Sequence, residues 1–407
     1  MPELQVLSWQ AADALHVMPT YTRQPLQVVR GEGEYVFDEQ DQKYLDWTSG
    51  IAVCALGHCH PALVAAATEQ IQTLWHISNL YLTAPQAQLA EKLTNASGFD
   101  RVFFSNSGAE ANEAAIKLAR RYSKHQYGAH KGEIITFSHS FHGRTLATVT
   151  ATAQPKYQEG IGPLPGGFRY VESMTIGAVR AAISPKTCAI MIEPIQGEGG
   201  VRLVAREFMQ ELRNLCDDLG LLLIFDEVQT GAGRTGEWLA WQALGVKPDI
   251  VTMAKALAGG MPMGATMANE DVASAFSAGT HGSTFGGNPI AARVAVAVLD
   301  TVLASGFLEN VRNLGQRLQR ELLALAVQVE EVDEVRGMGL MWGVQLSRPV
   351  AAKVVDACRD RGLLVLTAGA DTIRLLPPLI VTESALTWAV QVLGDAITSV
   401  FAKVIES

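Results

Sequence analysis

The sequence has few cysteines and no long apolar run. Its five cysteines among 407 residues are too few and too scattered for a disulfide framework, and they favour a reducing compartment, so we expect a cytoplasmic protein. No apolar run approaches the roughly 18 residues of a membrane span. The first residues carry neither a basic start nor an apolar core, which is not the pattern of a secretory signal.

Basic residues are scarcer than acidic ones. The formal net charge of −9 argues against nucleic acid or an anionic membrane as a partner. The run His58-Cys59-His60 invites a metal interpretation, but adjacent side chains do not converge easily on one ion, and no second ligand pair follows at finger-like spacing. We therefore expect no metal, and instead a turn that leads into a helix starting near Pro61.

Short apolar runs alternate with helical patterns in the middle of the chain. Helical patterns cover about 109–125 and 206–218, and the strand candidates are 101–106, 133–138, 187–194, 221–228 and 249–255. This alternation predicts an α/β fold with a mostly parallel sheet covered by helices on both faces. Such sheets bind ligands beyond the carboxyl ends of their strands, so the residues just after each apolar run are the candidates for a site.

The pattern changes after about residue 289. Helices are predicted over 290–304, over 308–326 and from about 382 onward, with short segments between them, which indicates a smaller α+β domain. The N-terminal GEGEYVFDEQDQKYLDW is typical of a hairpin and is expected to join that domain. The predicted division is therefore an N-terminal segment 1–59 belonging to the small domain, a large ligand-binding domain 60–289, and a small C-terminal domain 290–407.

One lysine, Lys255, stands alone in the apolar run IVTMAKALAGGMPMG. By itself it would most simply extend its amine to water while its stem packs. Two other strand ends change that interpretation. Ser107, Gly108 and Ala109 open a helix, where free N–H groups suit a phosphate, although a plain N-cap is common there. Asp226 ends an apolar strand, although it could simply cap the next helix.

The three features together favour one cofactor. Pyridoxal phosphate needs a lysine for its Schiff base, an acid beside its pyridine nitrogen and a phosphate cradle. The lysine amine must be neutral to attack a carbonyl, and an apolar setting lowers its pKa for that purpose. Lys255 and Asp226 end consecutive strand candidates, so both side chains are expected in one crevice.

Several motifs extend this pattern: SNSGAEANEAAIKLAR, FHGRT, EPIQGEGG, FDEVQTGAGRTG, AKALAGGMPMGA and HGSTFGGNP. In this order they resemble the class III pyridoxal-phosphate aminotransferases, and most closely the acetylornithine group, including its succinylornithine-using members. The resemblance runs from about Tyr21 to Pro378. It implies the fold type I architecture, with a mostly parallel sheet in a large domain beside a smaller α+β domain. It also implies a homodimer whose active sites lie at the subunit interface.

The resemblance assigns cofactor-binding roles by position. Lys255 is similar to the Schiff-base lysine, and Asp226 to the carboxylate that keeps the pyridine nitrogen protonated. The other residues it implies are Ser107, Gly108 and Ala109 around the phosphate, Phe141 and Val228 on the two faces of the ring, Gln229 near the ring hydroxyl, and Thr284 at the phosphate of the partner subunit's cofactor.

Substrate recognition is expected to depend on two arginines, because a guanidinium binds carboxylate in a bidentate manner. Arg144 resembles the residue that holds the carboxylate far from the reacting amine, and Arg374 the one that binds the α-carboxylate of glutamate or 2-oxoglutarate. Glu198 resembles a gate that pairs with Arg374 when the donor has no carboxylate there; otherwise it would be a solvated loop acid. Glu193 is expected to be a supporting hydrogen-bonding residue.

One position bears on the donor substrate. Ile51 stands where the ornithine-specific relatives have a tyrosine, and an apolar, roomier wall suits an N-acylated donor. Tyr21 and Arg23 match positions near the substrate mouth. The expected reaction transfers the terminal amino group of N2-acetyl-L-ornithine to 2-oxoglutarate, giving N-acetyl-L-glutamate 5-semialdehyde and glutamate, in arginine biosynthesis.

Alternatives remain open at this stage. Succinylornithine, succinyldiaminopimelate or ornithine could be the donor, because the acyl end is loosely specified. A decarboxylase or aminomutase would use the same cofactor. A non-catalytic phosphate- or nucleotide-binding α/β protein belongs to a different class, but the G-x-G-x-x-G pattern is missing and such a binder would not need Lys255, Asp226 and Arg374 together.

Overall fold

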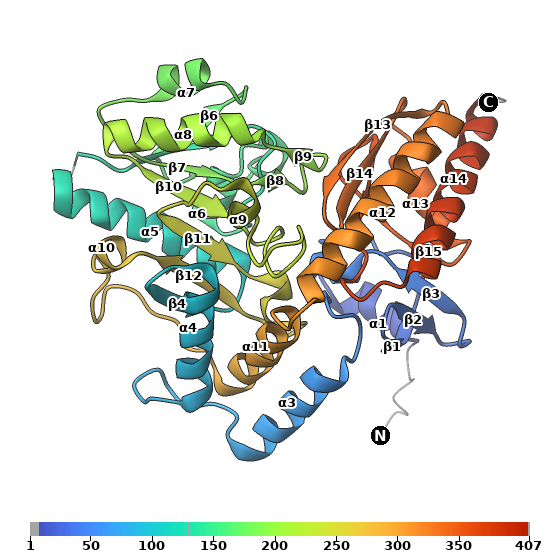
Figure 1. The fold of residues 1–407 in the computed structure, drawn as a ribbon, viewed down its shortest axis with the longest axis horizontal. Helices are drawn as coiled ribbons and strands as arrows, with labels where there is room; N and C mark the ends of the chain where they lie inside the picture. Colours follow the sequence, from blue (N-terminus) through green and yellow to red (C-terminus); the bar gives the residue numbers. More distant parts are fainter. Residues whose placement is uncertain (1–7, 129, 406–407) are drawn as a thin grey trace.

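A seven-stranded sheet forms the centre of the larger part of the molecule (Figure 1). The computed structural model describes residues 8–128 and 130–405. The strand order is β4-β12-β11-β10-β7-β5-β6. The strands are β4 (Arg101–Ser105), β5 (Glu133–Phe137), β6 (Phe168–Val171), β7 (Thr187–Ile192), β10 (Leu222–Asp226), β11 (Ile250–Met253) and β12 (Gly264–Ala268).

The strand directions confirm the prediction of a mostly parallel sheet. The neighbours from β11 to β6 pair in parallel, whereas β12 is antiparallel to both β11 and β4. The sequence analysis did not predict β12 or β6. Every residue of β12 is buried, so its GATMA sequence has no alternation of exposed and buried positions to mark it as a strand.

Helices cover both faces of this sheet because its central strands alternate between two apolar cores. In β10, Leu222 and Ile224 pack in the core that includes Ile116 and Leu118 of α5 (Gly108–Tyr127). The intervening residues of β10 belong to the other core, together with Phe208 of α8 (Arg206–Leu219). This two-sided burial explains why the predicted strand is a continuous apolar run.

Two smaller sheets build the rest of the molecule. One has the order β13-β14-β17-β16, formed by β13 (Val332–Met338), β14 (Met341–Leu346), β17 (Thr372–Leu375) and β16 (Leu366–Thr367). The other contains β1 (Val28–Glu32), the predicted hairpin β2 (Tyr35–Asp38) and β3 (Lys43–Asp46), and β15 (Leu363–Leu364). β15 pairs in parallel with β3, so segments from the two ends of the chain share one sheet, blue beside orange and red in Figure 1.

The predicted domain division 1–59, 60–289 and 290–407 stays a prediction, and residues 1–7 and 406–407 of it lie outside the described residues. Long helices form where they were predicted after residue 289, with a 69° bend between the first two. These are α11 (Pro289–Val302), α12 (Phe307–Gln328) and α14 (Glu383–Ile405). α14 is long and apolar enough to span a membrane, but 61% of that window is buried in the protein, as in the core helix of a globular domain.

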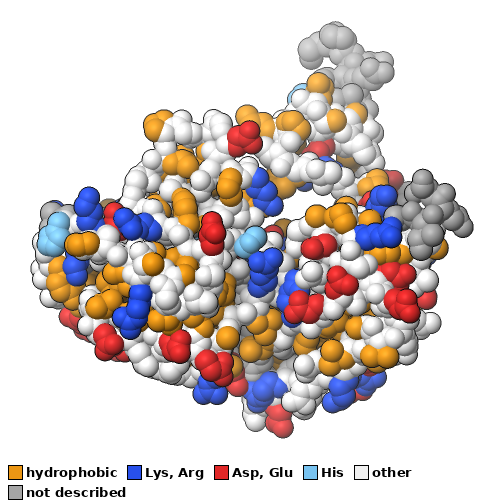
Figure 2. Space-filling model, turned by 90° about the horizontal axis from the view of Figure 1, so that it is seen from above, with side chains coloured by type: hydrophobic (Ala, Val, Ile, Leu, Met, Phe, Trp, Pro, Cys, Tyr) orange, Lys and Arg blue, Asp and Glu red, His pale blue; other side chains and the backbone are white. Residues whose placement is uncertain are grey.

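Shorter helices complete the described chain: α1 (Trp9–His16), α2 (Ser49–Ala52), α3 (Pro61–Thr73), α4 (Ala84–Ser97), α6 (Leu146–Ala151), α7 (Ile176–Ala182), α9 (Ala240–Leu244), α10 (Glu270–Ala273) and α13 (Ala351–Arg359). α3 begins at the predicted Pro61. A two-stranded ribbon, β8 (Ile195–Gln196) with β9 (Arg202–Leu203), follows β7. On the face that Figure 2 shows, acidic and basic side chains are interspersed rather than gathered by sign.

Candidate active site

The carboxyl ends of β4, β5, β10 and β11 lie at one edge of the large sheet and surround a cavity of about 440 Å³. This is where ligands bind in sheets of this kind. Most of the residues singled out from the sequence line the cavity: Ser107, Gly108, Ala109, Phe141, Arg144, Glu198, Asp226, Val228, Gln229 and Lys255. They come from segments spread over residues 107–255, more than a third of the chain.

Lys255 begins a 3₁₀ turn, Lys255–Ala258, directly after β11. Its backbone adopts a left-handed conformation, with φ of +46°, which is uncommon for a residue with a side chain. Burial lowers the pKa of its ammonium group from 10.5 to about 8, partly opposed by the carboxylate of Glu198. A substantial fraction of the amine is therefore neutral near physiological pH, as nucleophilic attack on a carbonyl requires.

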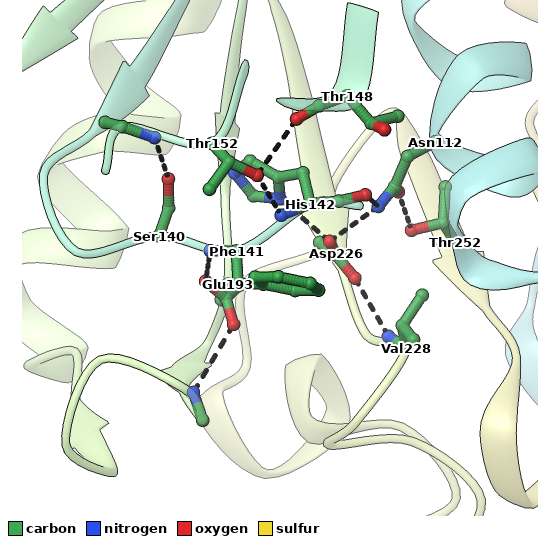
Figure 3. Close-up of polar contacts among 12 residues, drawn as sticks. Asn112, Ser140, Phe141, His142, Thr148, Thr152, Glu193, Asp226, Val228 and Thr252 are labelled. Atoms are coloured by element: carbon green, nitrogen blue, oxygen red, sulfur yellow. Dashed lines mark hydrogen bonds and ion pairs between the residues drawn. The ribbon is translucent and has the colours of Figure 1, made fainter. Parts of the chain in front are cut away.

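Asp226 is the last residue of β10, and its buried carboxylate is held by three donors (Figure 3). Oδ1 accepts from the backbone N–H of Val228 at 3.0 Å. Oδ2 accepts from Asn112 Nδ2 at 2.7 Å and lies 2.8 Å from His142 Nδ1. Asn112 is oriented in turn by a 2.7 Å hydrogen bond from Thr252 Oγ1 of β11. The carboxylate thus faces the cavity in a fixed orientation.

His142 and Asn112 were not predicted as site residues. Both signals were present in motifs already quoted: His142 follows Phe141 in FHGRT, and Asn112 lies one helical turn after Gly108 in SNSGAEAN. A buried polar side chain needs a partner, and here both meet Asp226. Within the described chain, His142 Nε2 is buried without a hydrogen-bond partner.

The amino end of α5 lines the same cavity as Asp226. Ser107 caps the helix, and its Oγ accepts from Glu110 N at 3.2 Å. The first N–H groups of a helix have no partner within it, so this 20-residue helix presents donors and a positive dipole end to the cavity. Because Gly108 has no side chain, the side chain of Val228 can lie close to its backbone: a Cβ at this position would lie 2.8 Å from Val228 Cγ1.

Arg374, from β17 in the smaller part of the molecule, does not itself line the cavity but contacts Glu198 and Gln229, which do. It is 2% exposed, and its Nη1 donates to Glu198 Oε1 at 2.5 Å, to Gly197 O at 3.0 Å and to Gln229 Oε1 at 3.2 Å. Burial alone would raise the pKa of Glu198, but the positive charges of Arg374 and Lys255 lower it below its usual value. Glu198 is therefore an anion paired with the guanidinium.

Glu193 and Arg144 complete the polar wall. Glu193 is buried and accepts from the backbone N–H groups of Phe141, at 2.8 Å, and Gly197, at 3.4 Å. Burial, and next the charge of Asp226, raises the pKa of Glu193 well above its usual value. The guanidinium carbon of Arg144 lies 4.1 Å from the centre of the Tyr157 ring, which holds it at the rim.

Other residues from the sequence analysis lie outside this cavity. Thr284 lines a separate one of about 320 Å³ beside Asn106 and Ser283. Tyr21 is 73% exposed, and Arg23 is paired with Asp13. Ile51 is 45% exposed at the mouth, two residues before Val53, which lines the cavity.

The histidine-rich turn that invited a metal interpretation is engaged elsewhere. His58 Nε2 lies 2.8 Å from Asp46 Oδ2, so this imidazole has a carboxylate partner on β3. His60 is the residue before α3, and its Nδ1 is buried with no hydrogen-bond partner within residues 8–128 and 130–405.

Comparison with known families decides the assignment of the whole chain. The family model described as aminotransferase class-III matches residues 17–397. The chain belongs to the class III aminotransferases. A curated acetylornithine aminotransferase from Agrobacterium fabrum is 50% identical over 373 residues, which cover 91% of this chain and 93% of that one.

Solved structures of class III aminotransferases have the same fold. An N-acetylornithine aminotransferase from Stenotrophomonas maltophilia is similar with a TM-score of 0.84 at 38% identity, over 97% of this chain and 99% of that one. An ornithine aminotransferase from Toxoplasma gondii is similar with a TM-score of 0.93 at 30% identity, over 97% and 95%. The predicted fold type I architecture and the predicted pyridoxal-phosphate-dependent transaminase are confirmed, and the non-catalytic binder is set aside.

The cavity of this class III aminotransferase fits pyridoxal phosphate on its own chemistry. A lysine amine with a lowered pKa, a buried carboxylate and the donor-rich end of a helix line the same space, as the aldehyde, pyridine nitrogen and phosphate of that cofactor need. When bound, the cofactor supplies an electron sink for the carbon that loses its proton.

Proposed function

We propose that this class III aminotransferase transfers the terminal amino group of N2-acetyl-L-ornithine to 2-oxoglutarate, giving N-acetyl-L-glutamate 5-semialdehyde and L-glutamate, in arginine biosynthesis. The relatives named acetylornithine aminotransferase support this proposal at 50% identity over most of both chains. The observation that carries it is the ion pair between Arg374 and Glu198 in the cavity wall. It suits an enzyme that alternates between a substrate with a carboxylate beside the reacting carbon and one without.

The cofactor roles of the cavity residues form part of the proposal. Lys255 would hold the cofactor through its amine, and the same amine would carry the proton that the substrate carbon loses. Asp226 keeps the pyridine nitrogen protonated, which its fixed, buried carboxylate favours. The remaining contacts are Ser107, Gly108 and Ala109 with the phosphate, Phe141 and Val228 with the ring faces, and Gln229 with the ring hydroxyl.

Two arginines share the substrate carboxylates. Arg144, at the rim, binds the carboxylate of the acylated donor that lies far from the reacting amine. Arg374 binds the α-carboxylate of glutamate or 2-oxoglutarate, and Glu198 then moves away. With the acylated donor, Glu198 returns and neutralises Arg374, because an unpaired buried charge is costly. Tyr21 is exposed in the single chain, and its proposed role is to contact the substrate at the mouth of the cavity in the assembled enzyme.

Several amino donors are candidates for this enzyme. The structural similarity to an ornithine aminotransferase makes ornithine the second candidate, and succinylornithine and succinyldiaminopimelate share the acylated end. Ile51, half exposed at the mouth, favours the acylated donors because it offers an apolar wall and no partner for a free α-amino group.

A panel of specificity constants tests this function directly. Acetylornithine, succinylornithine, succinyldiaminopimelate and ornithine are each offered with 2-oxoglutarate, and the glutamate formed is measured. We expect acetylornithine to have the highest kcat/KM. Ornithine as the best donor would overturn the argument from Ile51, and no glutamate from any donor would overturn the proposed activity.

We also propose a homodimer, in the cytoplasm, with each active site completed by its partner. Segment 74–82 exposes apolar side chains, among them Trp75 and Leu82, and Asn79 ties this segment to the loop of Thr284 by donating to Ser283 O and Gly286 O at 3.0 Å. Such a surface is typical of an interface. Because Asn79 holds the Thr284 loop against this apolar segment, Thr284 would lie at the same interface, which supports a contact between Thr284 and the partner's cofactor phosphate. All five cysteines are free, as in a reducing compartment.

A charge placed on that surface tests the dimer. Leu82→Asp should give a monomer by light scattering and weaken cofactor retention, whereas Val327→Asp, at another highly exposed apolar position, on α12, should leave the dimer intact. A wild-type monomer, or a Leu82→Asp dimer as stable as the wild type, would contradict this proposal.

A further inference from the structure

The mouth of the cavity contains a backbone conformation that is rare for L-residues. Four successive residues, Ser49 to Ala52, have φ values of +45°, +62°, +63° and +64°. Only Gly50 among them adopts this region without steric cost. Ile51 is β-branched, which makes its left-handed conformation especially unfavourable. A left-handed turn of this length persists only when its surroundings hold it in place.

The turn lies where it affects the reaction. It packs against the 3₁₀ turn Lys255–Ala258, and the residue that follows it, Val53, lines the cavity. Ser49 and Ala52 are buried, whereas Ile51 points outward at the mouth. The left-handed path therefore leaves Ile51 exposed two residues before Val53, which lines the cavity.

One carboxylate organises the entry of this turn. Asp46 Oδ1 accepts from Thr48 N at 2.8 Å, from Thr48 Oγ1 at 2.6 Å and from Ser49 N at 3.1 Å. The other oxygen, Oδ2, lies 2.8 Å from His58 Nε2. The hydrogen bond to Asp46 raises the pKa of His58 to about 10, so the pair is charged at neutral pH. The exit is held as well, because Val53 N and Cys54 N both donate to Ser49 O at 2.8 Å.

His58 is itself fixed by the N-terminal hairpin. Its backbone pairs with Gly33 in both directions, at 2.7 and 3.0 Å. Gly31 leaves room for the ring, since a Cβ there would lie 2.7 Å from the Cβ of His58. His58 thus holds the segment after the turn against the N-terminal hairpin, which also carries Asp46 at the end of β3.

We propose that Asp46 and His58 are positioning residues for donor specificity: their ion pair holds the left-handed turn 49–52 and thereby the wall, Ile51 and Val53, that the acyl group of the donor meets. This inference rests on the proposed function, in which the acylated end lies at the mouth. The 2-oxoglutarate half-reaction depends on Arg374, which contacts Glu198 and Gln229 and not the turn, and so is affected less.

The test compares the two substrates in His58→Gln and, independently, Asp46→Asn. His60→Gln, two residues away and without an ion pair in the described chain, is the matched control. If only about one tenth of the variant molecules keep the left-handed turn, the KM for acetylornithine should rise about tenfold. KM for 2-oxoglutarate should change little, and amide hydrogens of 49–54 should exchange faster in both variants but not in the control.

Two outcomes would overturn the inference: an unchanged KM for acetylornithine in both variants, or an equal rise for both substrates, which a merely structural role predicts. If wild-type protein fails to use any acylated donor, the proposed function fails instead, and the exchange rates alone then decide whether the pair holds the turn.

Ile51→Gly covers the case in which the pair variants do not fold. Glycine accepts a left-handed conformation, so the melting temperature should rise while the lost side chain raises KM for acetylornithine. In this background His58→Gln should speed amide exchange of the turn less than it does with isoleucine present. A lower melting temperature together with an unchanged KM would contradict the proposal.

Discussion

Replacing Glu198 by glutamine removes the charge of the gate while keeping its shape. In the structure Glu198 Oε1 lies 2.5 Å from Arg374 Nη1, and the two side chains are 25% and 3% exposed. Breaking a buried pair costs about 3–5 kcal/mol and losing an exposed one about 0.2–1 kcal/mol. In this pair one side chain is buried and the other partly exposed, so the cost of breaking it lies between these values, at about 2 kcal/mol. A hydrogen bond from glutamine to Arg374 retains part of that free energy.

The change should act on the two amino donors unequally. Glutamate must displace Glu198 from Arg374, and in Glu198→Gln it no longer competes with a charge. Acetylornithine places no carboxylate at Arg374, so the substitution does not raise kcat/KM for acetylornithine. A difference of at most about 2 kcal/mol corresponds to a shift of at most about 30-fold in the ratio of kcat/KM for glutamate to kcat/KM for acetylornithine.

Single-turnover mixing of the purified enzyme with each donor, followed by absorbance, measures this ratio. Glu237→Gln is the control, because Glu237 also pairs with an arginine, Arg312 at 3.0 Å, but in a more exposed place away from the cavity. It should leave the ratio as in the wild type. A ratio unchanged in Glu198→Gln would refute the gate, and so would an equal loss of both half-reactions.

Further expected outcomes concern the same cavity. Arg374→Ala should impair the 2-oxoglutarate half-reaction more than the acetylornithine one in steady-state assays; equal losses would argue against its assigned role. Lys255→Ala should abolish turnover, and appreciable residual activity would mean that another group does the chemistry. Capture of pyridoxal phosphate by apoprotein should accelerate as pH rises through about 8 and then level off, since burial lowers the pKa of Lys255 and only its neutral amine attacks; acceleration that continues to pH 10.5 would contradict this. His142→Asn should lower the free energy of unfolding in urea by about 2 kcal/mol, because it removes a hydrogen bond to the Asp226 carboxylate; an unchanged midpoint would show that the contact is dispensable.

The helices and most strands of the large sheet were predictable because their signals are local. An apolar run such as 221–228 and the periodic pattern of α5 are each contained in a short window. The strand β12 was not predictable, because burial on both faces of a five-residue segment removes the alternation and leaves small residues without a distinctive pattern. β11 lies close to β12 in the chain, but the antiparallel insertion also requires pairing with β4, more than 150 residues earlier.

The residues of the candidate site also differ in whether a local sequence signal marks them. Lys255, Asp226 and the opening of α5 stand out in the sequence because each is a polar group at the end of an apolar strand or the start of a helix. His142 and Asn112 do not stand out, because their importance lies in contacts with Asp226 that span 84 and 114 residues of chain. The pairing of Arg374 with Glu198 across 176 residues could be expected only from the family resemblance.

By itself the sequence determined the class of protein: alternating strands and helices, an amine in apolar company, an acid and a phosphate-ready helix at neighbouring strand ends. These features follow from the chemistry and spacing of nearby residues. The tertiary structure alone decided how distant segments meet. It placed three donors on Asp226, a guanidinium on Glu198, and an Asp46–His58 pair behind a left-handed turn. Such contacts depend on how the whole chain packs, and no short window of sequence contains that information.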